Sequence, residues 1–397
     1  MLRGSGQTER GSGQTARGSG PSVVVAVALS ARPQTGGHAW FVRTWLQGLA
    51  RLGCEVLLVD RLLADTPSPA AEALVRAVCA GAGVEGALLL GEGRSSGLTY
   101  AEVFRRVADA DVVLDVMGFL GDGGPDLLAA ARLPVFLDVD PGVGQQWAAL
   151  GLHDPYGRYA RHVTVGSRIG TAGCSVPTCG RQWVTTLPPV LLDEWPRQHS
   201  PGRAVTSVGM WRGPYAPLQV DGRRHGQRAH EFRRYADLSG RLRYPLEVAL
   251  AFEDWDGADR AALELAGWQL PLPQEVAGSL ESYRSFVAGS AGELCIARES
   301  YVVSQCGWFS DRSAAYLASG RPVVASDTGF GVALPVGEGV FAVDGPDEAT
   351  AALEAIAAEP GRHAVAARQL AEEYLDSDRV LGALLARLGS TSARVAA

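Results

Sequence analysis

The chain has 397 residues, 47% of them apolar, and a formal net charge of −7. This length and apolar content are sufficient for two domains, and the acidic balance provides no positive field for a nucleic-acid backbone. All 36 basic residues are arginines, because the sequence contains no lysine. The composition therefore excludes a phosphate loop that depends on lysine and Schiff-base chemistry on a lysine.

The six cysteines are scattered along the chain. Cys174 and Cys179 stand close together, but no second pair and no histidine at zinc-ligand spacing accompanies them. Free thiols or one local disulfide are therefore favoured over a metal site. No stretch reaches the ~20 apolar residues of a membrane span, and the first apolar run is too short for a signal peptide. We expect a cytoplasmic protein.

The first half of the chain predicts an α/β domain. Residues 1–21 form a Gly/Ser-rich repeat that we exclude from the fold. Val23–Leu29 is a continuous apolar run, as in a buried parallel strand. Gly36, Gly37 and His38 then open an amphipathic helix, and a second strand follows it. The two glycines would let backbone N–H groups approach a ligand closely.

Polar residues follow another strand of this half. Pro134–Leu137 leads into Asp138 and Asp140, with Gln146 shortly after. Because α/β ligands bind at the carboxyl edge of the sheet, these three side chains are candidates for binding a second substrate.

A change of composition predicts the domain boundary. Residues 196–203 are polar and contain proline and glycine, as in a linker. We therefore expect a first domain at 22–198, a second at 199–375, and a final helix and tail at 376–397 that returns towards the first domain. The second domain opens with a strand and the turn that carries Arg212, and Arg223 or Arg224 follows as a further cation. Arginine is suited to bidentate binding of phosphate.

The most informative stretch runs from Tyr301 to Gly331. We predict a short strand at Tyr301–Val303, a helix at Arg312–Ser319 capped by Asp311, and a strand at Arg321–Ser326. The order strand, helix, strand indicates a βαβ unit on a parallel sheet. The start of the helix collects unpaired N–H groups and the positive end of the helix dipole, which suits phosphate. Candidate ligands there are Ser310, Asp311, Arg312 and Ser313.

The run Leu317–Asp327, with Gly329 after it, resembles the donor-site signature of nucleotide-sugar glycosyltransferases with the GT-B fold, of the family 4 type found in actinobacteria. The resemblance implies two Rossmann-like, doubly wound domains facing a central cleft. It also implies that the helix start faces the nucleotide diphosphate and that the turn Asp327-Thr328-Gly329 faces the sugar. Many retaining members carry a glutamate that holds the ribose where this chain has Ala315, and Asp311 is the nearest substitute.

This resemblance predicts transfer of a sugar from a nucleoside-diphosphate sugar to a small-molecule or glycan acceptor, as in natural-product or glycan biosynthesis. No cofactor and no metal are expected. A general base, if the reaction inverts, would be His38 or Asp122, with Asp115 as a further candidate. Asp138 and Asp140 also resemble the metal motif of GT-A transferases, which we consider the weaker interpretation. A nucleotide-sugar epimerase and a catalytically inactive binding subunit remain alternatives.

Overall fold

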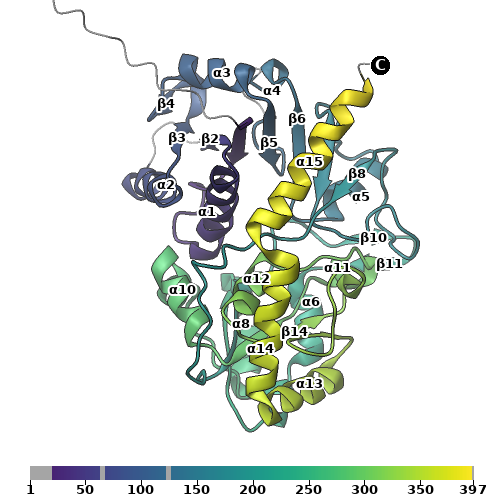
Figure 1. Cartoon of the computed structure of the whole chain (residues 1–397). Coiled ribbons are helices and arrows are strands. Elements are labelled where there is room, and N and C mark those ends of the chain that lie inside the picture. The colour runs from purple at the N-terminus through teal and green to yellow at the C-terminus, as the bar shows by residue number, and fades with distance from the viewer. Residues whose placement is uncertain (1–19, 63–67, 122–126, 396–397) are drawn as a thin grey trace, which may run out of the picture.

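The computed structural model describes residues 20–62, 68–121 and 127–395. It contains two α/β domains, one above the other in Figure 1, each built on its own parallel sheet. The chain passes from the first sheet to the second between Thr185 and Val205. The predicted class, α/β with two doubly wound domains, is confirmed.

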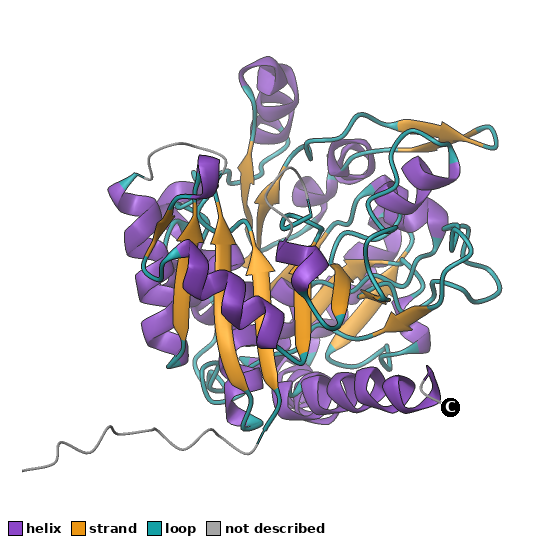
Figure 2. Cartoon of the chain, turned by 90° about the horizontal axis from the view of Figure 1, so that it is seen from above, coloured by secondary structure: helices purple, strands orange, loops and turns teal. Residues whose placement is uncertain are grey.

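The first sheet has the order β4-β3-β2-β1-β5-β6-β7-β8, and all of its pairs are parallel except β3 with β4. Its strands are β1 (Ser22–Val27), β2 (Glu55–Arg61), β3 (Glu85–Leu89), β4 (Ser95–Ser96), β5 (Val112–Val116), β6 (Pro134–Asp138), β7 (Arg161–Thr164) and β8 (Trp183–Thr185). Its helices are α1 (Gly36–Arg51), α2 (Pro69–Ala82), α3 (Tyr100–Asp109), α4 (Leu127–Ala130) and α5 (Val143–Ala149). Figure 2 shows these helices on both faces of the sheet.

The second sheet has the order β12-β9-β13-β14-β15 and is entirely parallel. Its strands are β9 (Val205–Met210), β12 (Leu246–Ala251), β13 (Gly292–Cys295), β14 (Val323–Ser326) and β15 (Val340–Val343), and β10 (Leu218–Val220) and β11 (Arg223–His225) form a separate hairpin. The helices are α6 (Arg228–Phe232), α7 (Leu238–Arg241), α8 (Gly257–Leu265), α9 (Pro273–Ala277), α10 (Leu280–Gly289), α11 (Glu299–Ser304), α12 (Asp311–Ala318), α13 (Pro346–Ala358), α14 (Pro360–Leu370) and α15 (Ser377–Val395).

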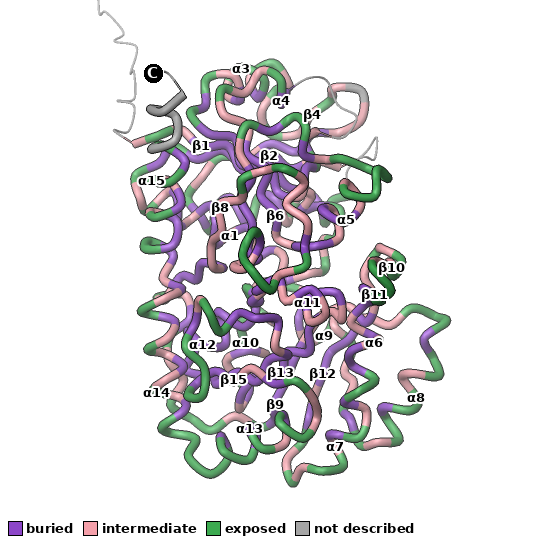
Figure 3. Tube along the Cα trace, turned by 90° about the vertical axis from the view of Figure 1, so that its right-hand side faces the viewer, coloured by how far each residue is buried: buried purple, intermediate pink, exposed green. Residues whose placement is uncertain are grey.

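The central strands are mostly apolar and almost fully buried because both faces of each sheet are covered. In β1, Val23 and Val25 pack against α1 and α2, whereas Val24 and Ala26 pack against α3 and α4. The burial colours of Figure 3 show the same layering, with buried strands inside and exposed helix surfaces outside. The second sheet is covered in the same way, by α10, α12 and α14 on one face and by α6, α8 and α13 on the other.

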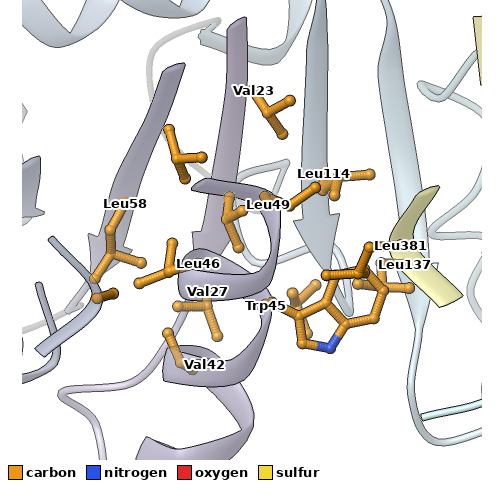
Figure 4. Close-up of a cluster of buried hydrophobic side chains, with 14 of the residues drawn as sticks. Val23, Val27, Val42, Trp45, Leu46, Leu49, Leu58, Leu114, Leu137 and Leu381 are labelled. Carbon is orange, nitrogen blue, oxygen red and sulfur yellow. The ribbon is translucent and has the colours of Figure 1, made fainter. Parts of the chain in front are cut away.

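The last helix joins the two domains. α15 leaves the second domain and packs against α1 of the first, as Figure 1 shows in yellow. Its Leu381 lies in the first core beside Trp45 and Leu137 (Figure 4). A Cβ atom on Gly48 would lie 2.5 Å from Leu381, so glycine is needed for this close approach.

Two local predictions around α12 were wrong. Tyr301–Val303 is not a strand but part of α11, because the place beside β14 in the sheet is already taken by β13. The β-branched residues of this segment suggested a strand, and tertiary structure overrode that preference. The N-cap of α12 is Ser310 rather than Asp311, and its Oγ accepts a hydrogen bond from the N–H of Arg312 at 3.2 Å.

Candidate functional site

Both sheets have a topological switch point, where the strand order reverses and the helices leave on opposite faces. It lies between β1 and β5 in the first sheet and between β9 and β13 in the second. In open α/β sheets such points are the usual ligand sites. Contacts between the domains join residues that follow these strands, so the two carboxyl edges meet at the domain boundary.

The glycines that precede His38 lie at this boundary. A Cβ atom on Gly36 would lie 2.1 Å from the carbonyl oxygen of Ser279, and one on Gly37 would lie 3.1 Å from the ring of Tyr283. The absence of side chains therefore lets the start of α1 approach the second domain directly.

An ion pair also connects the two domains. Both Nη1 hydrogen bonds of Arg298 go to Asp140, at 2.6 and 2.8 Å, and the hydroxyl of Tyr301 donates to the same carboxylate. Gln146 forms a second connection, with its Nε2 2.7 Å from Nδ1 of His225. Asp140 and Gln146, predicted to bind an acceptor, thus contact the second domain.

Two arginines from opposite domains meet at the carboxyl end of β9. Arg32, from the loop after β1, donates to the sulfur of Met210 at 3.0 Å. Arg228, at the start of α6, reaches the carbonyl oxygen of Met210 at 3.4 Å, and its Nε is buried without a hydrogen-bond partner. No carboxylate of the described residues forms an ion pair with either guanidinium. Burial and the charge of nearby Arg312 lower the pKa of Arg228.

Arg312, predicted to bind phosphate, is instead held inside the second domain. Its guanidinium forms an ion pair with the fully buried Glu293 and donates to the carbonyl oxygen of Val208 at 2.8 Å and to the sulfur of Cys295 at 3.1 Å. Each of the three guanidinium nitrogens therefore has a protein partner. Ser313 is also fully buried, and its Oγ has no partner among the described residues.

Asp311 keeps accessible surface at the first position of α12. It lines a small hollow of ≈ 20 Å³, enough for about one water molecule, together with Gly37, Tyr283 and Ala315. Aromatic residues form most of the remaining wall. The small side chain of Ala315 contributes to this space.

His38 lies in the first turn of α1 and is half-buried. Burial, and then the positive charge of Arg32, lowers its pKa to about 4. The ring is therefore neutral at pH 7, and it is a weak base for proton abstraction. Asp122, the other predicted base, lies outside the described residues. Asp115 is fully buried and accepts hydrogen bonds from the N–H groups of Leu120 and Gly121.

Asp138 lies behind Asp140 and is only 1% exposed. Its carboxyl group accepts hydrogen bonds from Nε2 of Gln145 at 2.6 Å and from Oγ1 of Thr164 at 3.0 Å. Burial raises its pKa to about 7. Both carboxyl groups of the Asp-x-Asp motif therefore have protein partners.

The other arginines predicted to bind the diphosphate, Arg212, Arg223 and Arg224, are more exposed than Arg312. Arg212 forms an ion pair with Asp256 at 2.6 Å, and Arg224 forms one with Glu299 at 2.6 Å. Arg223 is exposed on β11.

The turn Asp327-Thr328-Gly329 follows β14. Asp327 accepts a hydrogen bond from the N–H of Gly329 at 2.7 Å, and Gly329 has a φ of +88°, which favours glycine. A Cβ atom there would lie 2.6 Å from both Cδ and Nη1 of Arg168, which comes from the first domain. The turn predicted to face a sugar is thus in contact with an arginine of the opposite domain.

Solved structures share this arrangement of two domains. An alpha-glucosyltransferase in complex with UDP and a mismatched DNA superposes with a TM-score of 0.58 at 11% identity, covering 94% of this chain and 100% of that one. HepE of Anabaena, in complex with UDP-glucose, gives 0.57 at 11% identity, with 93% and 99% covered. The fold is GT-B.

The N-terminal domain of a trehalose-6-phosphate phosphatase from Candida albicans also has this fold, with a TM-score of 0.54 at 10% identity and 95% and 98% of the two chains covered. No protein-family model matches the sequence, and no curated protein matches it. Within the described residues, no helix is both long and apolar enough to cross a membrane. At these identities the likeness establishes the GT-B fold, and the site residues must be argued from this chain.

The sequence pattern did not indicate three arginines of the boundary, namely Arg32, Arg168 and Arg228. Each lies in a loop or at a helix start without a recognisable motif. Arg228 stands three residues before Glu231, which suggests a local ion pair, but Glu231 binds Arg234 at 2.7 Å instead. Only the distribution of carboxylates in three dimensions identifies which arginines are unpaired.

Proposed function

We propose that this protein is a glycosyltransferase that uses a nucleoside-diphosphate sugar and a small-molecule or glycan acceptor. One observation carries the proposal: in a GT-B fold, Arg32 and Arg228 meet at the end of β9 without a carboxylate partner among the described residues. Arg32 is exposed, whereas Arg228 is partly buried, and a partly buried cation without a counter-ion is unfavourable. A diphosphate between the domains would supply the missing negative charge and bidentate acceptors.

In the proposed reaction, the bond from C1 of the sugar to the diphosphate oxygen breaks, and C1 bonds to an acceptor oxygen. The proton of the acceptor hydroxyl passes to water or to the departing diphosphate, whose oxygen gains negative charge as the bond to C1 breaks. Arg32 and Arg228 stabilise that charge in the transition state, and the free N–H groups at the start of α12 add to it. These groups perform the task without a metal ion, so we propose metal-independent transfer.

His38 and Asp311 take positioning roles in this proposal. A neutral His38 can donate one hydrogen bond and accept another, which suits sugar or acceptor hydroxyls. Asp311 is exposed at the start of α12 and can accept hydrogen bonds from ribose hydroxyls. The turn Asp327-Thr328-Gly329 is the proposed contact for the sugar.

The acceptor is proposed to be other than nucleic acid. DNA is present in the complex of the neighbouring alpha-glucosyltransferase, and that observation belongs to that protein. This chain carries a net charge of −7. Backbone phosphates dominate the affinity of DNA-binding proteins, and an acidic surface opposes them.

A donor screen followed by a turnover assay tests the proposal. UDP, GDP and dTDP, and a sugar conjugate of each, are titrated into the protein by calorimetry. We expect one nucleotide to bind, and its sugar conjugate to be consumed in the presence of EDTA when a pool of glycan and small-molecule acceptors is supplied. An isomerised donor would identify an epimerase, and binding with neither reaction would identify an inactive subunit. Binding of none of the nucleotides would contradict the proposal.

A further inference from the structure

Several arginines lie along the carboxyl edge of the second sheet, and they differ in whether a carboxylate neutralises them. At the end of β9, Arg32 and Arg228 lack carboxylate partners among the described residues. After the neighbouring strand β13, Arg298 is neutralised by Asp140. Beyond the next strand, β14, Arg168 again stands without one. The carboxylate of Asp327, directly after β14, accepts a hydrogen bond from the N–H of Gly329 and forms no ion pair with Arg168.

Arg168 is half-buried between the domains, and its guanidinium donates few hydrogen bonds to the protein. Its Nη1 donates to the side-chain oxygen of Gln305 at 3.2 Å, and its Nη2 donates to the carbonyl oxygen of Ala172 at 3.1 Å. Both acceptors are uncharged, and a guanidinium has five N–H donors. No ion pair of the described residues includes it.

The loop of Arg168 is fixed, so the guanidinium has a defined place. The N–H of Arg168 donates to the carbonyl oxygen of Cys306 at 3.1 Å, and the N–H and Oγ of Ser167 both donate to the carbonyl oxygen of Gly307. Gly166 forms an antiparallel bridge with Trp308. The side chain then lies over Gly329, in the turn that we propose as the sugar contact.

In this inference the diphosphate of the donor lies at the end of β9, beside Arg32 and Arg228, and its sugar lies at the turn after β14, beside Arg168.

We infer that Arg168 binds a carboxylate on the donor sugar, so that the donor is a nucleoside-diphosphate uronic acid. The inference rests on the proposed function, and it specifies the class of sugar. A guanidinium and a carboxylate form two parallel hydrogen bonds, which a neutral hydroxymethyl group cannot reproduce.

Matched donors test this inference by calorimetry. With the nucleotide found in the donor screen, the acidic and neutral members of one pair are compared, for example the glucuronate with the glucose conjugate or the mannuronate with the mannose conjugate. We expect the wild-type protein to bind the acidic donor roughly 10- to 100-fold more tightly. Arg168→Gln should remove this preference by weakening only the acidic donor, and Arg168→Lys should retain part of it.

Arg158→Gln is the control, because Arg158 is an exposed arginine of the same domain whose Nη1 donates only to the carbonyl oxygen of Gly121. It should leave both affinities unchanged. Equal weakening of both donors in Arg168→Gln would show a merely structural role and overturn the inference. So would equal affinity of the wild-type protein for the two donors, while the proposed function would stand. If no nucleotide sugar binds, the proposed function fails as well.

Discussion

Two arginines lie near the same edge of the second sheet, and their surroundings are opposite. Arg312, at the start of α12, is paired with the buried Glu293 and is completed by Val208 and Cys295. Arg228, at the start of α6, has one long hydrogen bond to Met210 and a buried Nε without a partner. The arginine at one helix start therefore stabilises the fold, whereas the arginine at the other remains available to a ligand.

The comparison teaches that a helix start is not in itself an anion site. The free N–H groups and the dipole are present at both helices. What differs is whether a buried carboxylate has already neutralised the arginine. A site for an anion requires both the geometry and an unsatisfied charge.

The largest effect is expected from removing the paired arginine. Arg312→Gln leaves Glu293 buried without its cation and should lower the free energy of unfolding by about 3–5 kcal/mol. Urea denaturation followed by circular dichroism measures this change. The double variant Arg312→Met/Glu293→Leu removes both charges and should recover most of the loss. If Arg312→Gln unfolds like the wild type, the structural role of this pair is wrong.

Removing the unpaired arginine should affect the ligand instead. Arg228→Gln is expected to weaken binding of the nucleoside diphosphate by about 1.5–3 kcal/mol, because a charge-assisted hydrogen bond is lost. Binding of the corresponding nucleoside should hardly change, and the unfolding free energy should stay near that of the wild type. Calorimetry with both ligands separates the effects, with Arg158→Gln as the control. An equal loss for nucleoside and diphosphate would contradict the comparison.

A paired arginine can also be converted into an unpaired one. Asp140→Asn removes the charge that neutralises Arg298 across the domain boundary. We expect the unfolding free energy to fall by about 1–2 kcal/mol, since a partly buried cation loses its partner. Affinity for the nucleoside diphosphate should rise or stay constant, because a further cation becomes available. A marked loss of affinity with a normal fold would show instead that Asp140 itself contacts the ligand.

The smallest effect concerns Asp138. Its pKa rises from 3.8 to about 7 on folding, so the folded protein retains a proton that the unfolded chain releases. The unfolding free energy should therefore fall as pH rises from about 4 to about 7. Asp138→Asn should remove this component, on the order of 1 kcal/mol or more, when urea unfolding is compared at about pH 5 and about pH 7.5. An unchanged pH dependence would mean that Asp138 is ionised in the folded protein.

The sequence alone determined the architecture. Continuous apolar strands such as Val23–Val27 can form only where both faces of a sheet are covered, and the alternation of strands with amphipathic helices then requires doubly wound sheets. The run from Leu317 to Gly329 predicted the end of a helix and a strand of the second sheet, because capping and turn residues act locally. These signals depend on neighbours in the chain, and the sequence contains those neighbours.

Tertiary structure decided the identity of the charged groups at the site. Whether Arg228 or Arg312 is free depends on Glu293, which lies on β13, far from Arg228 in the chain. The position of Arg168 over Gly329 depends on how two separately folded sheets meet. Even the segment Tyr301–Val303, with strand-forming residues, became a helix because β13 already occupied its place. Electrostatic pairing and strand competition act through space, so they are settled only when the whole chain has folded.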